Sequence, residues 1–153
     1  MARILIADDD ELIAELASEV LIDIGHACGW VTTAEDAWEV AIKRRPDILL
    51  LDQNLPGMSG VTLLRKLRGS PQFYDLPVVM FTALRGAEDE NQAIYAGAHD
   101  FIRKPFDPAT LVSRVGRVLA KRSARGRHTD LKTSVLREAG LLRERSESAR
   151  RLI

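Results

Sequence analysis

The sequence predicts an α/β fold in which a doubly wound, five-stranded parallel sheet carries helices on both faces. Short apolar runs of strand length alternate along the chain with stretches in which apolar residues recur at helical spacing. Three of the five runs are almost continuously apolar, as is typical of parallel strands that are covered on both faces. Five such repeats in about 120 residues imply the doubly wound architecture with helices on both faces.

Each element can be placed by its pattern and by the residues that punctuate it. The expected strands are Ile4–Ala7, Ala27–Val31, Ile48–Leu51, Val78–Thr82 and Asp100–Ile102. The expected core-facing helical stripes are Leu12, Leu16, Val20 and Leu21; Ala37, Val40 and Ala41; Val61, Leu64 and Leu67; Ala93, Ile94 and Ala96; and Leu111, Val115, Val118 and Leu119. Gly25, Pro46, Pro56, Gly57, Pro77 and Gly97 fall between these segments, and Asp107 followed by Pro108 is typical of a helix start.

The composition excludes several classes of protein. Cys28 is the only cysteine among 153 residues, so neither a disulfide within the chain nor a multi-cysteine metal site can form. No apolar run is long enough to cross a membrane, and the start of the chain lacks the pattern of a signal peptide. We therefore expect a cytoplasmic protein.

The net charge of zero conceals two parts of opposite charge. Residues 1–120 hold 12 lysines and arginines against 18 acidic residues, whereas residues 121–153 hold 10 against 4. The sequence therefore predicts an acidic domain over residues 2–121, followed by a basic tail over residues 122–153 that is partly helical or disordered.

Polar residues follow four of the five expected strands. Asp8 and Asp9 follow the first, Asp52 follows the third, Thr82 ends the fourth and Lys104 comes soon after the fifth. Sites in such sheets form beyond the carboxyl ends of the strands. Taken singly, each residue has an ordinary structural explanation, such as a helix cap or a solvated charge. Together, carboxylates that a Mg²⁺ ion would neutralise, a lysine and a hydroxyl predict a pocket that receives a phosphoryl group.

Four segments carry a resemblance to a known family. The run from Ile4 to Asp10, the run from Leu51 to Gly60, Phe81-Thr82-Ala83 and Lys104-Pro105-Phe106 resemble the receiver domains of two-component signalling, which include single-domain chemotaxis regulators. The resemblance covers residues 2 to about 121. It implies a flavodoxin-like sheet with strand order 2-1-3-4-5.

The resemblance also implies a role for each matched residue. Asp52 is the implied phosphoacceptor, Asp9 binds Mg²⁺ directly, Asp8 acts largely through bound water, and the main-chain carbonyl of Asn54 is a further ligand. Thr82 and Lys104 are expected to contact phosphoryl oxygens, and the bond between Lys104 and Pro105 is expected to be cis. Phe101 occupies the position of a switch aromatic that turns inward with Thr82 on phosphorylation, although it could equally be a core residue.

The expected function is that of a response regulator without a separate output domain. Its donor would be a sensor histidine kinase or a histidine phosphotransfer protein, and its phosphorylated surface would bind a downstream protein. Beyond self-phosphorylation and dephosphorylation, no enzymatic activity is expected. A hydrolase with an aspartyl nucleophile is the alternative, but Asn54 stands where such enzymes often carry a second carboxylate. A nucleic-acid-binding role of the tail has only its charge in support and is not expected.

The tail contains a weak helical pattern. Leu131, Val135, Leu136, Ala139 and Leu142 recur at roughly helical spacing after Asp130, and Arg125-Gly126-Arg127 is typical of a hinge. Such a narrow apolar stripe is not stable alone. The tail is therefore either disordered or ordered against the acidic domain, a partner or a second copy of the chain, and among the ordered outcomes we favour a homodimer.

Overall fold

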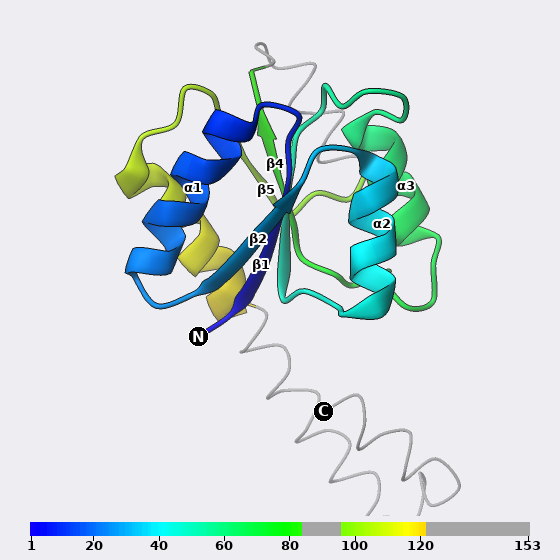
Figure 1. The fold of residues 1–153 in the computed structure, drawn as a ribbon. Helices are drawn as coiled ribbons and strands as arrows, with labels where there is room; N and C mark the ends of the chain where they lie inside the picture. Colours follow the sequence, from blue (N-terminus) through cyan, green and yellow to red (C-terminus); the bar gives the residue numbers. More distant parts are fainter. Residues whose placement is uncertain (84–95, 122–153) are drawn as a thin grey trace, which may run out of the picture. The chain divides into compact units, whose positions relative to one another are not determined.

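The computed structural model describes residues 1–83 and 96–121, and of Thr82 it describes the backbone alone. The described residues form a five-stranded parallel sheet with the order β2-β1-β3-β4-β5 (Figure 1). The predicted fold class and strand order are therefore confirmed. Residues Met1–Val118 form one compact unit.

The strands lie almost where the apolar runs predict them. They are β1 (Arg3–Ala7), β2 (Ala27–Val31), β3 (Ile48–Leu51), β4 (Val78–Thr82) and β5 (Asp100–Arg103). The first strand begins one residue earlier than predicted and the last ends one residue later. Ala7 pairs with Leu51 in the register of β1 and β3. The residues that follow these two strands therefore emerge side by side.

Helices cover both faces of the sheet. They are α1 (Glu11–Asp23), α2 (Ala34–Lys43), α3 (Gly60–Arg68) and a helix over residues 108–121. Figure 1 shows α1 and the helix that begins at residue 108 on one face, with α2 and α3 on the other.

The first three helices begin in the same way. A short polar side chain precedes each helix and accepts a hydrogen bond from the backbone N–H three residues further on. These bonds are Ile13 to Asp10, Asp36 to Thr33, and Thr62 to Ser59. The Asp10 cap places the start of α1 directly after the acidic residues at the end of β1.

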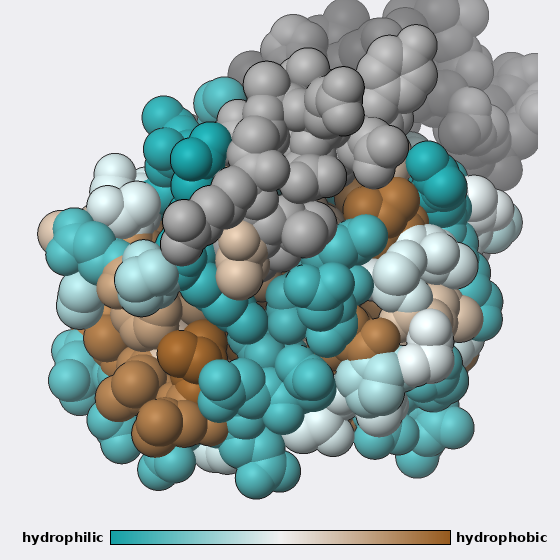
Figure 2. Space-filling view, turned by 90° about the horizontal axis from the view of Figure 1, so that it is seen from above, coloured by the Kyte–Doolittle hydropathy of each residue, from teal (hydrophilic) through white to brown (hydrophobic). Residues whose placement is uncertain are grey.

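The buried face of α1 agrees with the predicted one at Leu21 but not at Leu12 and Leu16. Leu12 and Leu16 are 64% and 43% exposed, whereas the helix packs on the sheet through Ala14, Ala17, Ser18 and Leu21. Small side chains let the helix axis approach the sheet closely, so the contact face is centred on the alanines and not on the larger leucines. In Figure 2, which looks down on the carboxyl ends of the strands, hydrophobic surface lies on the side of α1.

In α2 the buried residues are again alanines, whereas in α3 they are mainly leucines. Val40 is exposed, while Ala34, Ala37 and Ala41 are buried. The predicted stripe of α3 is largely confirmed, since Leu64 and Leu67 are fully buried, but Leu63 joins them and Val61 is only half-buried.

Residues of two predicted elements lie outside the described part of the chain. These are Ala93 and Ile94 of the predicted fourth stripe, whose third member Ala96 is half-buried against the main core cluster, and the tail over residues 122–153, with its apolar residues from Leu131 to Leu142. In the part of the chain that the structure describes, no helix has both the length and the apolar character needed to span a bilayer.

Candidate functional site

The ends of β1 and β3 bring two buried carboxylates together. Asp8 follows Ala7, and its backbone N–H donates to the carbonyl of Val31 in β2. Asp52 follows Leu51, and its backbone N–H donates to the carbonyl of Ala7 at 2.9 Å. Continuing ladder hydrogen bonds therefore fix both residues one position past the strands.

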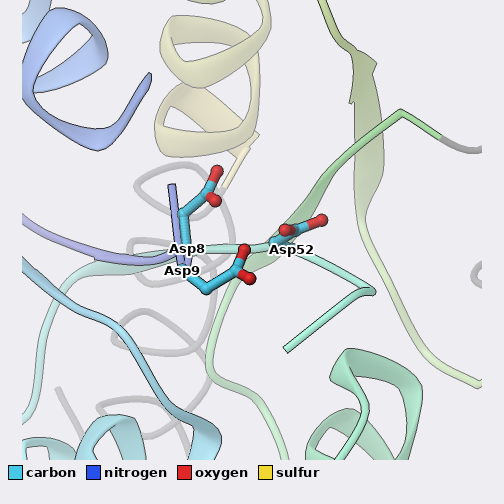
Figure 3. A group of neighbouring side chains, drawn as sticks. All are labelled: Asp8, Asp9 and Asp52. Atoms are coloured by element: carbon cyan, nitrogen blue, oxygen red, sulfur yellow. The ribbon is translucent and has the colours of Figure 1, made fainter. Parts of the chain in front are cut away.

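Asp9 adds a third carboxylate that is open to solvent. One oxygen from each of Asp8, Asp9 and Asp52 can be chosen so that all lie within 4.8 Å of one another. Figure 3 shows the three side chains gathered beyond the ends of β1 and β3. Asp8 is fully buried and Asp52 is 3% exposed. Three hard oxygen donors at this spacing fit a divalent cation such as Mg²⁺, and Asp9 is the one of the three that solvent reaches.

Lys104 reaches the same carboxylates from the far side of β4. Its Nζ lies 2.5 Å from Asp8 Oδ2 and 3.3 Å from Asp52 Oδ2, and it passes 5.2 Å from the centre of the Phe81 ring. The peptide bond between Lys104 and Pro105 is cis, as predicted. Three carboxylates and one lysine give this cluster of side chains a formal net charge of −2, which favours a bound cation.

Backbone N–H groups donate to the second carboxylate oxygen of Asp8 and to that of Asp52. The N–H of Asp10 donates to Asp8 Oδ1 at 2.9 Å, and the N–H of Asn54 donates to Asp52 Oδ1 at 3.3 Å. Both oxygens of Asp8 thus have close partners within the protein. Asp9, by contrast, is exposed and offers its carboxylate to a ligand.

The pKa of Asp52 is raised above its ordinary value. Burial is the largest cause, Lys104 opposes it, and the neighbouring Asp8 carboxylate adds to the rise. The raised pKa shows that the negative charge on Asp52 is costly in the absence of a cation, because both a low-dielectric surrounding and a like charge disfavour it.

This cost predicts a pH-dependent gain in stability for Asp52→Asn. A carboxyl whose pKa is higher in the folded than in the unfolded chain makes the free energy of unfolding fall as pH rises through its titration. With divalent cations chelated, the variant should therefore be more stable than the wild type at pH 7 and should gain less at pH 4. Denaturant titrations at both pH values test this. An equal gain at both would contradict it.

Glycine at position 60 is a site residue to which the sequence analysis gave no role. A Cβ atom there would lie 2.2 Å from the backbone oxygen of Asp52 and 2.9 Å from the Cα of Gln53. The start of α3 therefore packs directly on the backbone that carries Asp52, and a side chain at Gly60 would displace it. The signal in the sequence is a glycine directly after the helix-capping Ser59, where helix propensity gives no reason for one.

The remaining predicted site residues are Thr82, Phe101 and Asn54. The side chain of Thr82 lies outside what the structure describes. Phe101 is half-buried in β5 against the main core cluster, with the Arg114 guanidinium 5.9 Å from its ring centre. That place suits both a packing and a switch role. Asn54 is exposed next to Asp52.

The pocket, the fold and the strand-end residues agree with a match to known proteins. The model of the response regulator receiver domain matches residues 4–116. The chain belongs to the response regulator receiver domain family. Receiver domains are phosphoacceptor signalling modules and not catalytic enzymes, which favours the receiver interpretation of residues 4–116 over an aspartyl hydrolase.

Individual relatives support the same membership. The receiver is 40% identical over 119 residues to the phosphate regulon transcriptional regulatory protein PhoB of Pseudomonas aeruginosa, covering 77% of this chain and 52% of that protein. It is 40% identical over 114 residues to the response regulator PleD of Caulobacter vibrioides, covering 74% of this chain and 25% of PleD. The chain thus spans about half the length of PhoB and a quarter of that of PleD.

A single-domain structure is also similar. The chemotaxis protein CheY4 of Vibrio cholerae matches with a TM-score of 0.73 and 30% identity, covering 77% of this chain and 98% of that one. The receiver therefore matches nearly the whole of one solved chain and only part of longer regulators.

Proposed function

We propose that this receiver accepts a phosphoryl group on Asp52, with Mg²⁺, from the phosphohistidine of a sensor kinase or phosphotransfer protein. The observation that carries the proposal is the convergence of Asp8, Asp9, Asp52 and Lys104 at one edge of the sheet. A cytoplasmic location, where such donors operate, is part of the same proposal.

The transfer requires an ionised Asp52. Its carboxylate oxygen attacks phosphorus, the P–N bond of the phosphohistidine breaks, and the leaving imidazole keeps the electron pair and takes up a proton. Lys104 already contacts Asp52 and can pair with a phosphoryl oxygen at the same place. A bound Mg²⁺ supplies positive charge to the phosphoryl oxygens during the transfer.

The ligand roles follow from how each acid is held. The oxygens of Asp8 lie 2.5 Å from Lys104 Nζ and 2.9 Å from the backbone nitrogen of Asp10, closer than the two 3.3 Å contacts of Asp52, which supports contact of Asp8 with the cation through water. Asp9 is exposed and supports direct binding, together with Asp52 and the carbonyl of Asn54.

The response to phosphorylation is proposed to pass through Thr82 and Phe101. Thr82 donates its hydroxyl to the phosphoryl group, and Phe101 turns into the space that this movement opens. The half-buried position of Phe101 in β5, three residues before the lysine that contacts Asp52, supports this role. The altered surface then binds a downstream protein.

The proposed transfer is tested with acetyl phosphate as the donor. The wild type should gain one phosphoryl group by intact mass in the presence of Mg²⁺, and hydroxylamine should remove it, because an acyl phosphate reacts with this nucleophile whereas a serine phosphate does not. Uptake that proceeds equally in excess chelator, or a phosphoryl group that resists hydroxylamine, would contradict the proposal.

We also propose that the tail over residues 122–153 pairs two copies of the receiver. Asp100 is held within the chain by Arg114 at 2.8 Å and Arg117 at 2.6 Å, so the pairing is not expected to depend on this carboxylate. Sedimentation of the full chain against a chain that ends at Arg122 should show a dimer only for the first. If both sediment as monomers, with and without phosphorylation, the tail has another role.

A further inference from the structure

Gln53 ties the residue next to the phosphoacceptor to the start of α3. Its side-chain Oε1 accepts a hydrogen bond from the backbone N–H of Val61 at 2.7 Å, and its backbone carbonyl accepts one from Gly60 at 3.0 Å. The next N–H of the helix, that of Thr62, bonds to Ser59 Oγ at 3.3 Å. Three successive N–H groups at the helix start are thus satisfied, two of them by a single residue that lies outside the helix.

These two hydrogen bonds to Gln53 connect the two ends of the segment from Asp52 to Gly60, which carries the predicted cation ligands Asp52 and Asn54. Gln53 stands between Asp52 and Asn54, so its backbone position determines where the Asp52 carboxylate and the Asn54 carbonyl lie. The lack of a side chain at Gly60 lets the helix start rest directly on the backbone of Asp52 and Gln53. The side-chain bond from Gln53 therefore adds a second link, eight residues apart in sequence, to the same contact.

We propose that Gln53 is a positioning residue for cation binding and phosphoryl transfer. Its side-chain amide keeps the segment from Asp52 to Gly60 in the conformation that presents the ligands, and it does so without adding charge to a pocket that already holds three carboxylates. The proposal rests on the proposed function, since it concerns how the same site is held ready.

Losing the hydrogen bond between Gln53 and Val61 should lower the fraction of molecules in the conformation that binds the cation. Without the acceptor, the segment can leave the binding conformation, and the apparent affinity for the cation falls by the fraction of molecules that remain competent. A hydrogen bond of ordinary strength corresponds to a change of roughly three- to tenfold in that fraction. Saturating cation should restore most of the phosphorylation rate, because binding selects the competent conformation.

Four variants separate positioning from a general weakening of the helix. Gln53→Met keeps the length of the side chain but removes the acceptor, and Gln53→Asn keeps the amide but shortens its reach. Gln53→Glu keeps the acceptor and serves as the rescue. Ser59→Ala is the matched control, because it removes a different hydrogen bond at the same helix end without touching the link to Asp52.

The experiment measures the Kd for Mg²⁺ by calorimetry, the rate of uptake from acetyl phosphate at low and saturating Mg²⁺, and hydrogen exchange of the Val61 amide. Gln53→Met should weaken Mg²⁺ binding roughly three- to tenfold, slow uptake mainly at low Mg²⁺, and speed Val61 exchange. Gln53→Glu should keep Val61 protected and bind Mg²⁺ at least as tightly as the wild type. Ser59→Ala should leave the Kd within about twofold of the wild-type value.

Two results would overturn the proposal. One is wild-type Mg²⁺ affinity in Gln53→Met, and the other is an equal loss of affinity in Ser59→Ala. If Gln53→Met does not fold, Gln53→Asn provides the same comparison. A wild type that binds no Mg²⁺ would refute the proposed function and this inference together, whereas wild-type binding with no effect of Gln53→Met would refute the inference alone.

Discussion

Asp52→Asn is expected to abolish stable phosphoryl uptake from acetyl phosphate and Mg²⁺, while the wild type gains one group. The amide has no anionic oxygen to attack phosphorus, and Asp52 combines burial at a strand end with contact to Lys104. Asp8 also contacts Lys104, but it is held more tightly than Asp52. Its two oxygens lie 2.5 Å from Lys104 Nζ and 2.9 Å from the backbone nitrogen of Asp10, whereas both corresponding distances for Asp52 are 3.3 Å. We expect the rate to fall by roughly a hundredfold or more, since the nucleophile itself is lost.

The measurement is intact mass over a time course, with Asp10→Asn as the matched control. Asp10 is a neighbouring acid whose role is to cap α1 by accepting from Ile13, and asparagine caps helices equally well. The control should therefore be phosphorylated like the wild type. An Asp52→Asn protein that gains a stable and equal amount would show that the phosphoacceptor is another residue.

Asp9→Ala is expected to lose Mg²⁺ affinity and phosphorylation together. Asp9 is the exposed member of the three carboxylates and the one with the freest access to a cation. Loss of a direct charged ligand should raise the Kd for Mg²⁺ by at least roughly tenfold. Uptake should fall in parallel, because without the cation the carboxylates repel the incoming phosphoryl oxygens.

Calorimetric titration of Mg²⁺ and phosphorylation of the same sample test this link. Glu11→Ala is the matched control, since Glu11 is an exposed acid two residues along, in the first turn of α1. It should change the Kd by less than about twofold, as expected for an exposed charge that is not a ligand. Unchanged Mg²⁺ affinity in Asp9→Ala, or normal uptake by the wild type in excess chelator, would show that the cation does not bind at these carboxylates.

The strands and the strand-end chemistry were predictable because they depend on local patterns. A run such as Ile48–Leu51 is apolar at every position, which only a strand covered on both faces requires. Once the strands are parallel neighbours, residues that follow them must emerge at the same edge. The adjacency of Asp8 and Asp52 thus follows from the sequence and from the rules of parallel sheets.

The buried faces of the helices could not be read in the same way. In α1 the sequence offers a leucine stripe and an alanine stripe, and the spacing of apolar residues does not decide between them. Leu12 and Leu16 are exposed because the close approach of the helix to the sheet selects Ala14 and Ala17 for the contact. That distance is a property of the packed layers and is encoded by no single segment.

The sequence by itself determined the positions of the strands along the chain, the family and the set of functional groups at the edge of the sheet. Only the tertiary structure decided how Lys104 crosses Phe81 to reach both Asp8 and Asp52, and how Gln53 meets Val61. Hydrophobic periodicity is set by neighbours along the chain, so it is visible in the sequence. The reach of a flexible side chain to an atom on another element depends on the distance between those elements, which is fixed only when the whole core packs.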